Sequence, residues 1–198
     1  NTSGGGNIAV GWRALCSSTT AANNVAVGRE ALKSNTTGTC NVAIGLCTLY
    51  SNISTGNNTA IGILALRDNW AGNVNTGIGY HALKSNTTGY YNLAVGGHAL
   101  EDMTTGAQNV AVGHCALHQS NANNNTAVGM YAMLCNTSGT TNAALGLCAM
   151  CGNTTGHRNT GLGAHALLTS TNGYDNVAVG YKAMEDTTSG YRNVAVGC

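Results

Sequence analysis

The chain has 198 residues and a formal net charge of +1, and only 8% of its residues are charged, so it lacks the basic surface typical of nucleic-acid-binding proteins. It contains no Phe, no Pro and 28 glycines, and 5% of its residues are aromatic, which is too little bulk for an ordinary globular core. No apolar run is long enough to cross a bilayer, and the chain does not combine the low hydrophobicity and high net charge of disordered proteins.

The chain is built from one short repeat, for example NVAVGREALKSNTTGTC at residues 24–40. Positions in the repeat are counted here from its first Asn to position seventeen; position one is Asn and position five is Gly in all twelve copies. The copy at residues 109–124 is shorter than the others by a single position, which a deletion in a turn would explain. A period this short indicates a solenoid in which each copy forms one coil.

The elements expected along the chain follow from this pattern. Positions two to four alternate aliphatic and very small residues, which predicts a short strand that the Gly at position five ends. These strands are expected at residues 8–10, 25–27, 42–44, 59–61, 76–78, 93–95, 110–112, 126–128, 143–145, 160–162, 177–179 and 194–196. Positions seven to ten, such as residues 30–33, predict a second short strand. The Asn-Thr-Thr-Gly at residues 35–38 and its equivalents predict a turn.

Parallel stacking of such coils places equal positions above one another, about 4.8 Å apart. We therefore expect a side-chain amide ladder of the kind found in stacked β-structures at position one and a column of glycines at position five. The predicted Asn column is Asn7, Asn24, Asn41, Asn58, Asn75, Asn92, Asn109, Asn125, Asn142, Asn159, Asn176 and Asn193. The predicted Gly column is Gly11, Gly28, Gly45, Gly62, Gly79, Gly96, Gly113, Gly129, Gly146, Gly163, Gly180 and Gly197.

The small side chains predict that one coil stack is only marginally stable. If the alanines at positions three and eight fill the space inside the coil, the Val, Ile or Leu at position four must point outward. That apolar stripe would then need other chains to cover it. Three chains around an axis are the arrangement that we predict.

The motifs NVAVG and NVAIG resemble the S-V-A-I-G repeats of trimeric autotransporter adhesin heads, whose left-handed parallel β-rolls form homotrimers. The 17-residue form with Ala-Leu and Asn-Thr-Thr-Gly is more similar to repeats in tail fibres of bacteriophages and fibres of other viruses. This resemblance covers essentially the whole chain, although the coil is longer and Asn replaces Ser. We predict an all-β parallel β-solenoid (a β-roll) of about twelve 17-residue coils, left-handed and homotrimeric, as one domain over residues 1–198 that is a segment of a longer fibre.

Reactive side chains are interpreted mostly as surface residues. His81, His98 and Cys115 share position seven in three successive coils, within possible reach of one metal ion, but coincidence of variable surface residues is the favoured interpretation. The adjacent Glu101 and Asp102 are interpreted as a solvated turn. The cysteines have no neighbours in the same column, which favours free thiols. We predict no metal, no cofactor and no catalytic residue.

The predicted function is therefore structural and not enzymatic: a shaft or head segment of a trimeric fibre, on a virion or at a cell surface, that serves attachment. The expected partners are further copies of the chain, and a host receptor or glycan bound through another part of the fibre, with neither nucleic acid nor membrane insertion. A self-assembling extracellular filament is one alternative. An ice-binding solenoid is another, because Thr recurs at position thirteen.

Overall fold

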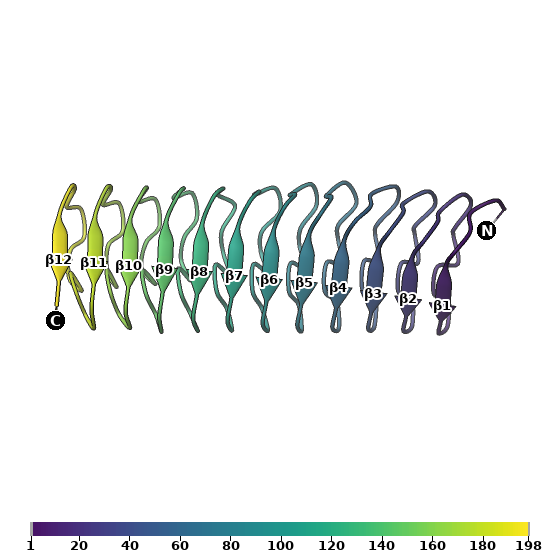
Figure 1. Cartoon of the computed structure of the whole chain (residues 1–198), viewed down its shortest axis with the longest axis horizontal. Coiled ribbons are helices and arrows are strands. Elements are labelled where there is room, and N and C mark those ends of the chain that lie inside the picture. The colour runs from purple at the N-terminus through teal and green to yellow at the C-terminus, as the bar shows by residue number, and fades with distance from the viewer. Residues whose placement is uncertain (1, 198) are drawn as a thin grey trace.

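The computed structural model describes residues 2–197, in which each repeat copy contributes one strand to a single parallel sheet. The twelve strands are β1 (Ile8–Val10), β2 (Val25–Val27), β3 (Val42–Ile44), β4 (Thr59–Ile61), β5 (Thr76–Ile78), β6 (Leu93–Val95), β7 (Val110–Val112), β8 (Thr126–Val128), β9 (Ala143–Leu145), β10 (Thr160–Leu162), β11 (Val177–Val179) and β12 (Val194–Val196). Figure 1 shows the coils stacked in chain order along one axis. The predicted all-β parallel solenoid is confirmed, and the described residues include no helix that could cross a membrane.

The register of the sheet follows the repeat. Ala26 pairs with Ala43, and Ala43 pairs with Ala60, so that each residue meets its equivalent in the next copy. The short copy keeps this register, because Ala111 still pairs with its equivalent, Ala127, although the interval between them is shorter by a single position. The missing residue therefore lies in a turn and leaves the strands aligned, as the sequence predicted.

The second strand predicted at positions seven to ten is wrong, because these residues form turns in the described coils. Glu30 at position seven has a φ of 58°, and Leu32 at position nine has a φ of 50°. Residues in the left-handed region cannot continue an extended strand. The turn is nevertheless bonded to both neighbouring coils: the Glu30 N–H donates to the Trp12 carbonyl over 2.8 Å, and the Leu32 N–H donates to the Thr48 carbonyl over 3.0 Å.

The core is a narrow space between the sheet and this turn. Ala26 at position three, Ala31 at position eight and Leu32 at position nine have no exposed surface, and the same three positions are buried in most coils. Because side chains alternate along a strand, positions two and four must face away from this core. The small residue at position three is what allows the sheet and the turn to lie so close together.

Candidate functional site

The Asn side chains at position one connect all twelve copies of the repeat. In each coil from the second to the last, the backbone N–H of this Asn donates to the Oδ1 atom of the Asn one coil earlier, over 2.9–3.0 Å. The Nδ2 group closes its own coil: that of Asn24 donates to the Gly38 carbonyl over 2.8 Å, and that of Asn75 to the Gly89 carbonyl over 2.7 Å. One Asn side chain thus bonds both to the next coil, through Oδ1, and to position fifteen of its own coil, through Nδ2.

A second buried ladder, which the sequence interpretation missed, runs along position twelve. The Nδ2 group of Asn52 donates to Oδ1 of Asn35 over 2.9 Å, and that of Asn86 donates to Oδ1 of Asn69 over 2.8 Å. This ladder is discontinuous: Nδ2 of Asn69 donates to Thr55 and Gly72 and not to Asn52, and Oδ1 of Asn86 has no hydrogen-bond partner where Met103 takes the Asn position. The recurrence of Asn at position twelve indicates such a ladder, since equal positions stack; from the sequence, this Asn is interpreted only as part of a turn.

The glycines at position five also form a column. Their φ angles lie between 121° and 137°, which is a region open mainly to glycine. A Cβ atom added to Gly96 would lie 2.6 Å from the carbonyl oxygen of Gly113 in the next coil. Position five is therefore restricted by both backbone conformation and coil spacing.

The outer face of the sheet is an apolar surface, called here the outer sheet face and formed by positions two, four and six. Position four is exposed at Ile44, Leu145 and Leu162, with 38%, 54% and 37% of their surfaces open to solvent. Position six adds exposed large side chains such as Leu46 and Ile63. No residue at positions two or four is charged in any copy, and Arg29 is the one Arg or Lys at position six. Position four thus points outward, as the packing argument required.

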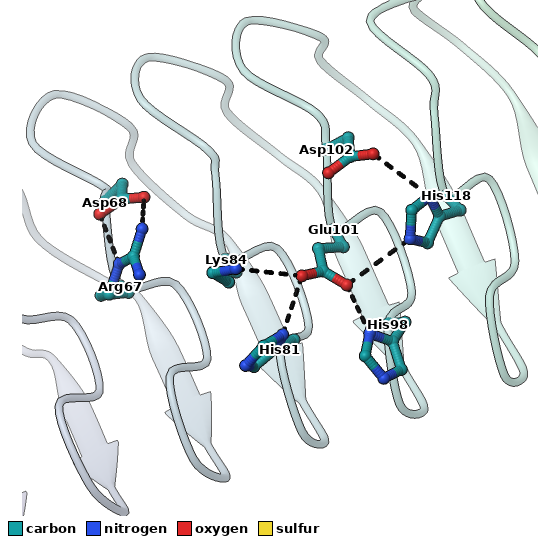
Figure 2. Close-up of polar contacts among 8 residues, drawn as sticks. All are labelled: Arg67, Asp68, His81, Lys84, His98, Glu101, Asp102 and His118. Atoms are coloured by element: carbon teal, nitrogen blue, oxygen red, sulfur yellow. Dashed lines mark hydrogen bonds and ion pairs between the residues drawn. The ribbon is translucent and has the colours of Figure 1, made fainter.

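A polar cluster lies on another part of the coil surface, in the columns of positions seven and ten. Figure 2 shows the Glu101 carboxylate at its centre, with Lys84 and three histidines directed toward it. Oε1 lies 2.8 Å from Nδ1 of His81 and 3.2 Å from Nζ of Lys84. Oε2 contacts Nδ1 of His98 and lies 3.5 Å from Nε2 of His118. The expectation of a solvated turn is wrong for Glu101, because only 9% of its surface is exposed.

The Glu101 carboxylate is held in its charged form. Burial acts to raise the pKa of Glu101, but hydrogen bonds from His98, His81 and Lys84 lower this pKa to about 2. The adjacent Asp102 contacts the other side of His118, with Oδ2 3.4 Å from Nδ1. An ionised carboxylate thus lies among three imidazole rings from three successive coils.

The three residues considered for a metal from the sequence do not all meet. His81 and His98 lie together, with their ring centroids 5.3 Å apart. Cys115 has its Sγ atom 3.4 Å from Nε2 of His114 and is not a member of the group of possible ligand atoms around Glu101. The sequence missed Glu101 because positions seven and ten become neighbours only through the shape of the turn.

Seven cysteines in the described chain are free thiols: Cys16, Cys40, Cys47, Cys115, Cys135, Cys148 and Cys151. Burial, together with the nearby Cys135 and Cys148, raises the pKa of the Cys151 thiol to about 11. Little thiolate is therefore present at Cys151 near neutral pH, and the thiolate is the form that reacts with alkylating agents.

We expect iodoacetamide to modify Cys151 at least about 10-fold more slowly than the exposed Cys40 in the folded protein. Alkylation followed over time by mass spectrometry of the separate peptides measures both rates in one sample. After denaturation the two rates should converge, which controls for differences between the peptides. Similar rates in the folded protein would contradict the shielding of Cys151.

Residues 2–197 enclose no pocket. The candidate sites are therefore surfaces: the outer sheet face and the polar cluster around Glu101. Comparisons of the chain with protein-family models, with curated proteins and with solved structures found no match.

Proposed function

We propose that this chain is a structural shaft or head segment of a trimeric fibre, such as a virus tail fibre or a surface adhesin, in which the solenoids are left-handed. Its role is to hold an attachment region at a distance, on a virion or at a cell surface. The receptor or glycan is then bound by another part of the fibre. The observation that carries this proposal is the outer sheet face.

The occupant that fits the outer sheet face best is the same face of two further copies. Positions two and four present Val, Ile, Leu, Thr or Ala in every coil, so copies aligned along the rod place like surfaces opposite one another at every level. No residue at positions two or four is charged, so burial of these two positions desolvates no ion; on the outer sheet face, Arg or Lys occurs only as Arg29 at position six. Closed rotational symmetry about one axis buries each face and leaves none free for further growth.

The interior supports a mechanical role. Each coil is bonded to its neighbours through the strand, the position-one ladder and the turn, as at Ala26, Asn24 and Leu32. These contacts repeat in every coil, so the rod has no weakly connected section within the described chain. Such a rod is stiff and keeps its two ends at a constant separation, which is what a fibre shaft requires.

Light scattering on a sizing column tests the trimer at two protein concentrations. We expect a mass of three chains of 20.0 kDa, unchanged on dilution. Replacing both Ile44 and Leu145 by Lys should convert the trimer to a monomer, because two charges per chain would be buried without partners. Asn172→Lys, at an exposed residue outside the sheet, is the matched control and should remain trimeric.

Two other outcomes of this measurement would overturn the trimer. Polydisperse rods that lengthen with concentration would indicate end-to-end association into a filament. A stable monomer with intact far-ultraviolet circular dichroism would mean that the outer sheet face serves as an open surface, as in an ice-binding solenoid.

The position-thirteen threonines argue against the ice-binding alternative. The hydroxyl of Thr36 donates to the Ile53 carbonyl over 3.1 Å, and that of Thr87 donates to the Thr104 carbonyl over 2.8 Å. These hydroxyl protons are bonded to the next coil and are not presented to water. The threonine column therefore stabilises the turns.

A further inference from the structure

The polar cluster around Glu101 contains the side chains of a metal site. One possible ligand atom from each of His81, His98 and Glu101 lies within 4.8 Å of the other two. Imidazole nitrogen and carboxylate oxygen are the ligands that Zn²⁺ and neighbouring divalent transition metals take from proteins. We propose that these three residues bind one divalent transition-metal ion, with Zn²⁺ as the representative case and His118 as the fourth ligand.

The distances in the cluster show which side chains must move to hold an ion. In a tetrahedral site with bonds of about 2.0–2.1 Å, neighbouring ligand atoms lie roughly 3.3 Å apart. The separation between Nδ1 of His81 and Oε1 of Glu101 is 2.8 Å, and that between Nε2 of His118 and Oε2 is 3.5 Å. These two distances go to different oxygens of Glu101, and His118 lies outside the group of atoms that are all within 4.8 Å of one another, so ion binding requires the His118 and Glu101 side chains to rotate toward a common point.

Neighbouring groups hold the imidazole rings in place. Oδ2 of Asp102 lies 3.4 Å from Nδ1 of His118, so the Nδ1–H group faces a carboxylate and Nε2 is left to face Glu101. This is the carboxylate–histidine arrangement that orients metal-binding histidines. The ring of His81 stacks on Tyr80 with a centroid separation of 3.8 Å.

His81 faces the cluster with one of its two ring nitrogens. Its Nε2 atom is buried and has no hydrogen-bond partner among the described residues, while Nδ1 faces Glu101. A metal ion in the cluster replaces the hydrogen bond at the ligating nitrogen with a coordinate bond. The ion also replaces Lys84 as the positive charge beside Glu101, a buried carboxylate.

Lys84 is the competitor for the same carboxylate oxygen. Its Nζ atom lies 3.2 Å from Oε1, and its side chain is 23% exposed, so the ammonium group reaches water by rotation about its flexible stem. Metal binding therefore displaces Lys84. Removal of this ammonium group should strengthen metal binding, whereas removal of an ordinary structural neighbour should not.

The site joins three coils, since its residues come from the repeats that begin at Asn75, Asn92 and Asn109. The ion thus cross-links three successive coils. The columns at positions seven and ten carry it, while the outer sheet face is formed by positions two, four and six. Metal binding and trimer formation are consequently separate properties, and each can fail without the other.

Isothermal titration with Zn²⁺, and the visible absorption of bound Co²⁺, test the proposal on the full chain. We expect one ion per chain and a tetrahedral Co²⁺ spectrum. His98→Ala and Glu101→Gln should each weaken binding by more than about 100-fold, which exceeds the effect of a residue that only orients a ligand. Asp102→Asn should weaken it by about 10-fold. Lys84→Gln should bind the ion more tightly than the parent chain.

His165→Ala is the matched control, because His165 also occupies position seven but no acidic side chain lies within ion-pair distance of it among the described residues. The Zn²⁺ affinity of the His165→Ala variant should equal that of the parent chain. Far-ultraviolet circular dichroism of each variant separates loss of a ligand from loss of fold, and His118→Gln supplies a second histidine variant, at a side chain that is 24% exposed. Absence of stoichiometric Zn²⁺ binding, or equal losses in the His165 and His98 variants, would overturn the site.

Discussion

Replacement of Gly96 by Ala is expected to destabilise the solenoid by about 3 to 5 kcal/mol. Gly96 has a φ of 132°, which a residue with a Cβ atom adopts only with strain. The added methyl group would also lie 2.6 Å from the Gly113 carbonyl oxygen and 2.7 Å from its carbon. Both atoms belong to the backbone of the next coil, so relief requires the two coils to move apart. Chemical denaturation followed by circular dichroism measures the change in the free energy of unfolding.

Gly97→Ala is the matched control, one residue away. The nearest atom to its added Cβ would be Nδ1 of His114 at 3.4 Å, an ordinary contact with a movable side chain. Position six also accepts residues as large as Trp12 in another coil. We expect a change below about 1 kcal/mol for this variant. Equal destabilisation by the two substitutions would refute the role assigned to position five.

Replacement of Asn75 by Ala is expected to destabilise the protein by about 3 kcal/mol. Oδ1 of Asn75 accepts hydrogen bonds from the backbone N–H of Asn92 over 3.0 Å and from its Nδ2 group over 3.1 Å. The Nδ2 group of Asn92 keeps its bond to Gly106, but its buried backbone N–H has no other partner and would be left unsatisfied. The bond from Asn75 to the Gly89 carbonyl would be lost as well.

The same position offers a pH-dependent variant, Asn75→Asp. A protonated Asp reproduces Asn by donating to Gly89, whereas an ionised one turns an oxygen toward that carbonyl. The folded-state pKa of this Asp should therefore lie above its unfolded value. The loss in free energy of unfolding, relative to the parent chain, should then grow as the pH rises from about 4 to about 7. Unfolding at both pH values measures this. A penalty that does not vary with pH would contradict the bond to Gly89.

Asn172→Ala is the control for both ladder variants. Asn172 is exposed and lies in a turn outside the ladders. Its replacement should change the free energy of unfolding by less than about 0.5 kcal/mol. A larger change would show that asparagines in general, and not the position-one column, determine the stability.

The sequence by itself determined the strands, their parallel order and their register. Identical residues at a constant interval can stack only with like above like, so Ala26 had to meet Ala43, and Asn24 had to meet Asn41. The small residue at position three and the aliphatic residue at position four also established which side of the strand faces inward. These conclusions depend on periodicity and side-chain size, which are read directly from the chain.

Only the tertiary structure decided the conformation of positions seven to ten and what they bring together. Leu32, like the other residues at position nine, has no local preference for a left-handed backbone; hydrogen bonds to neighbouring coils and burial of the side chain impose it. That turn, rather than a strand, places Glu101 beside His98 and within reach of His81 and His118 from the adjacent coils. The distances within the cluster depend on backbone angles that the surrounding stack enforces, and for this reason the sequence could suggest two histidines but not the carboxylate between them.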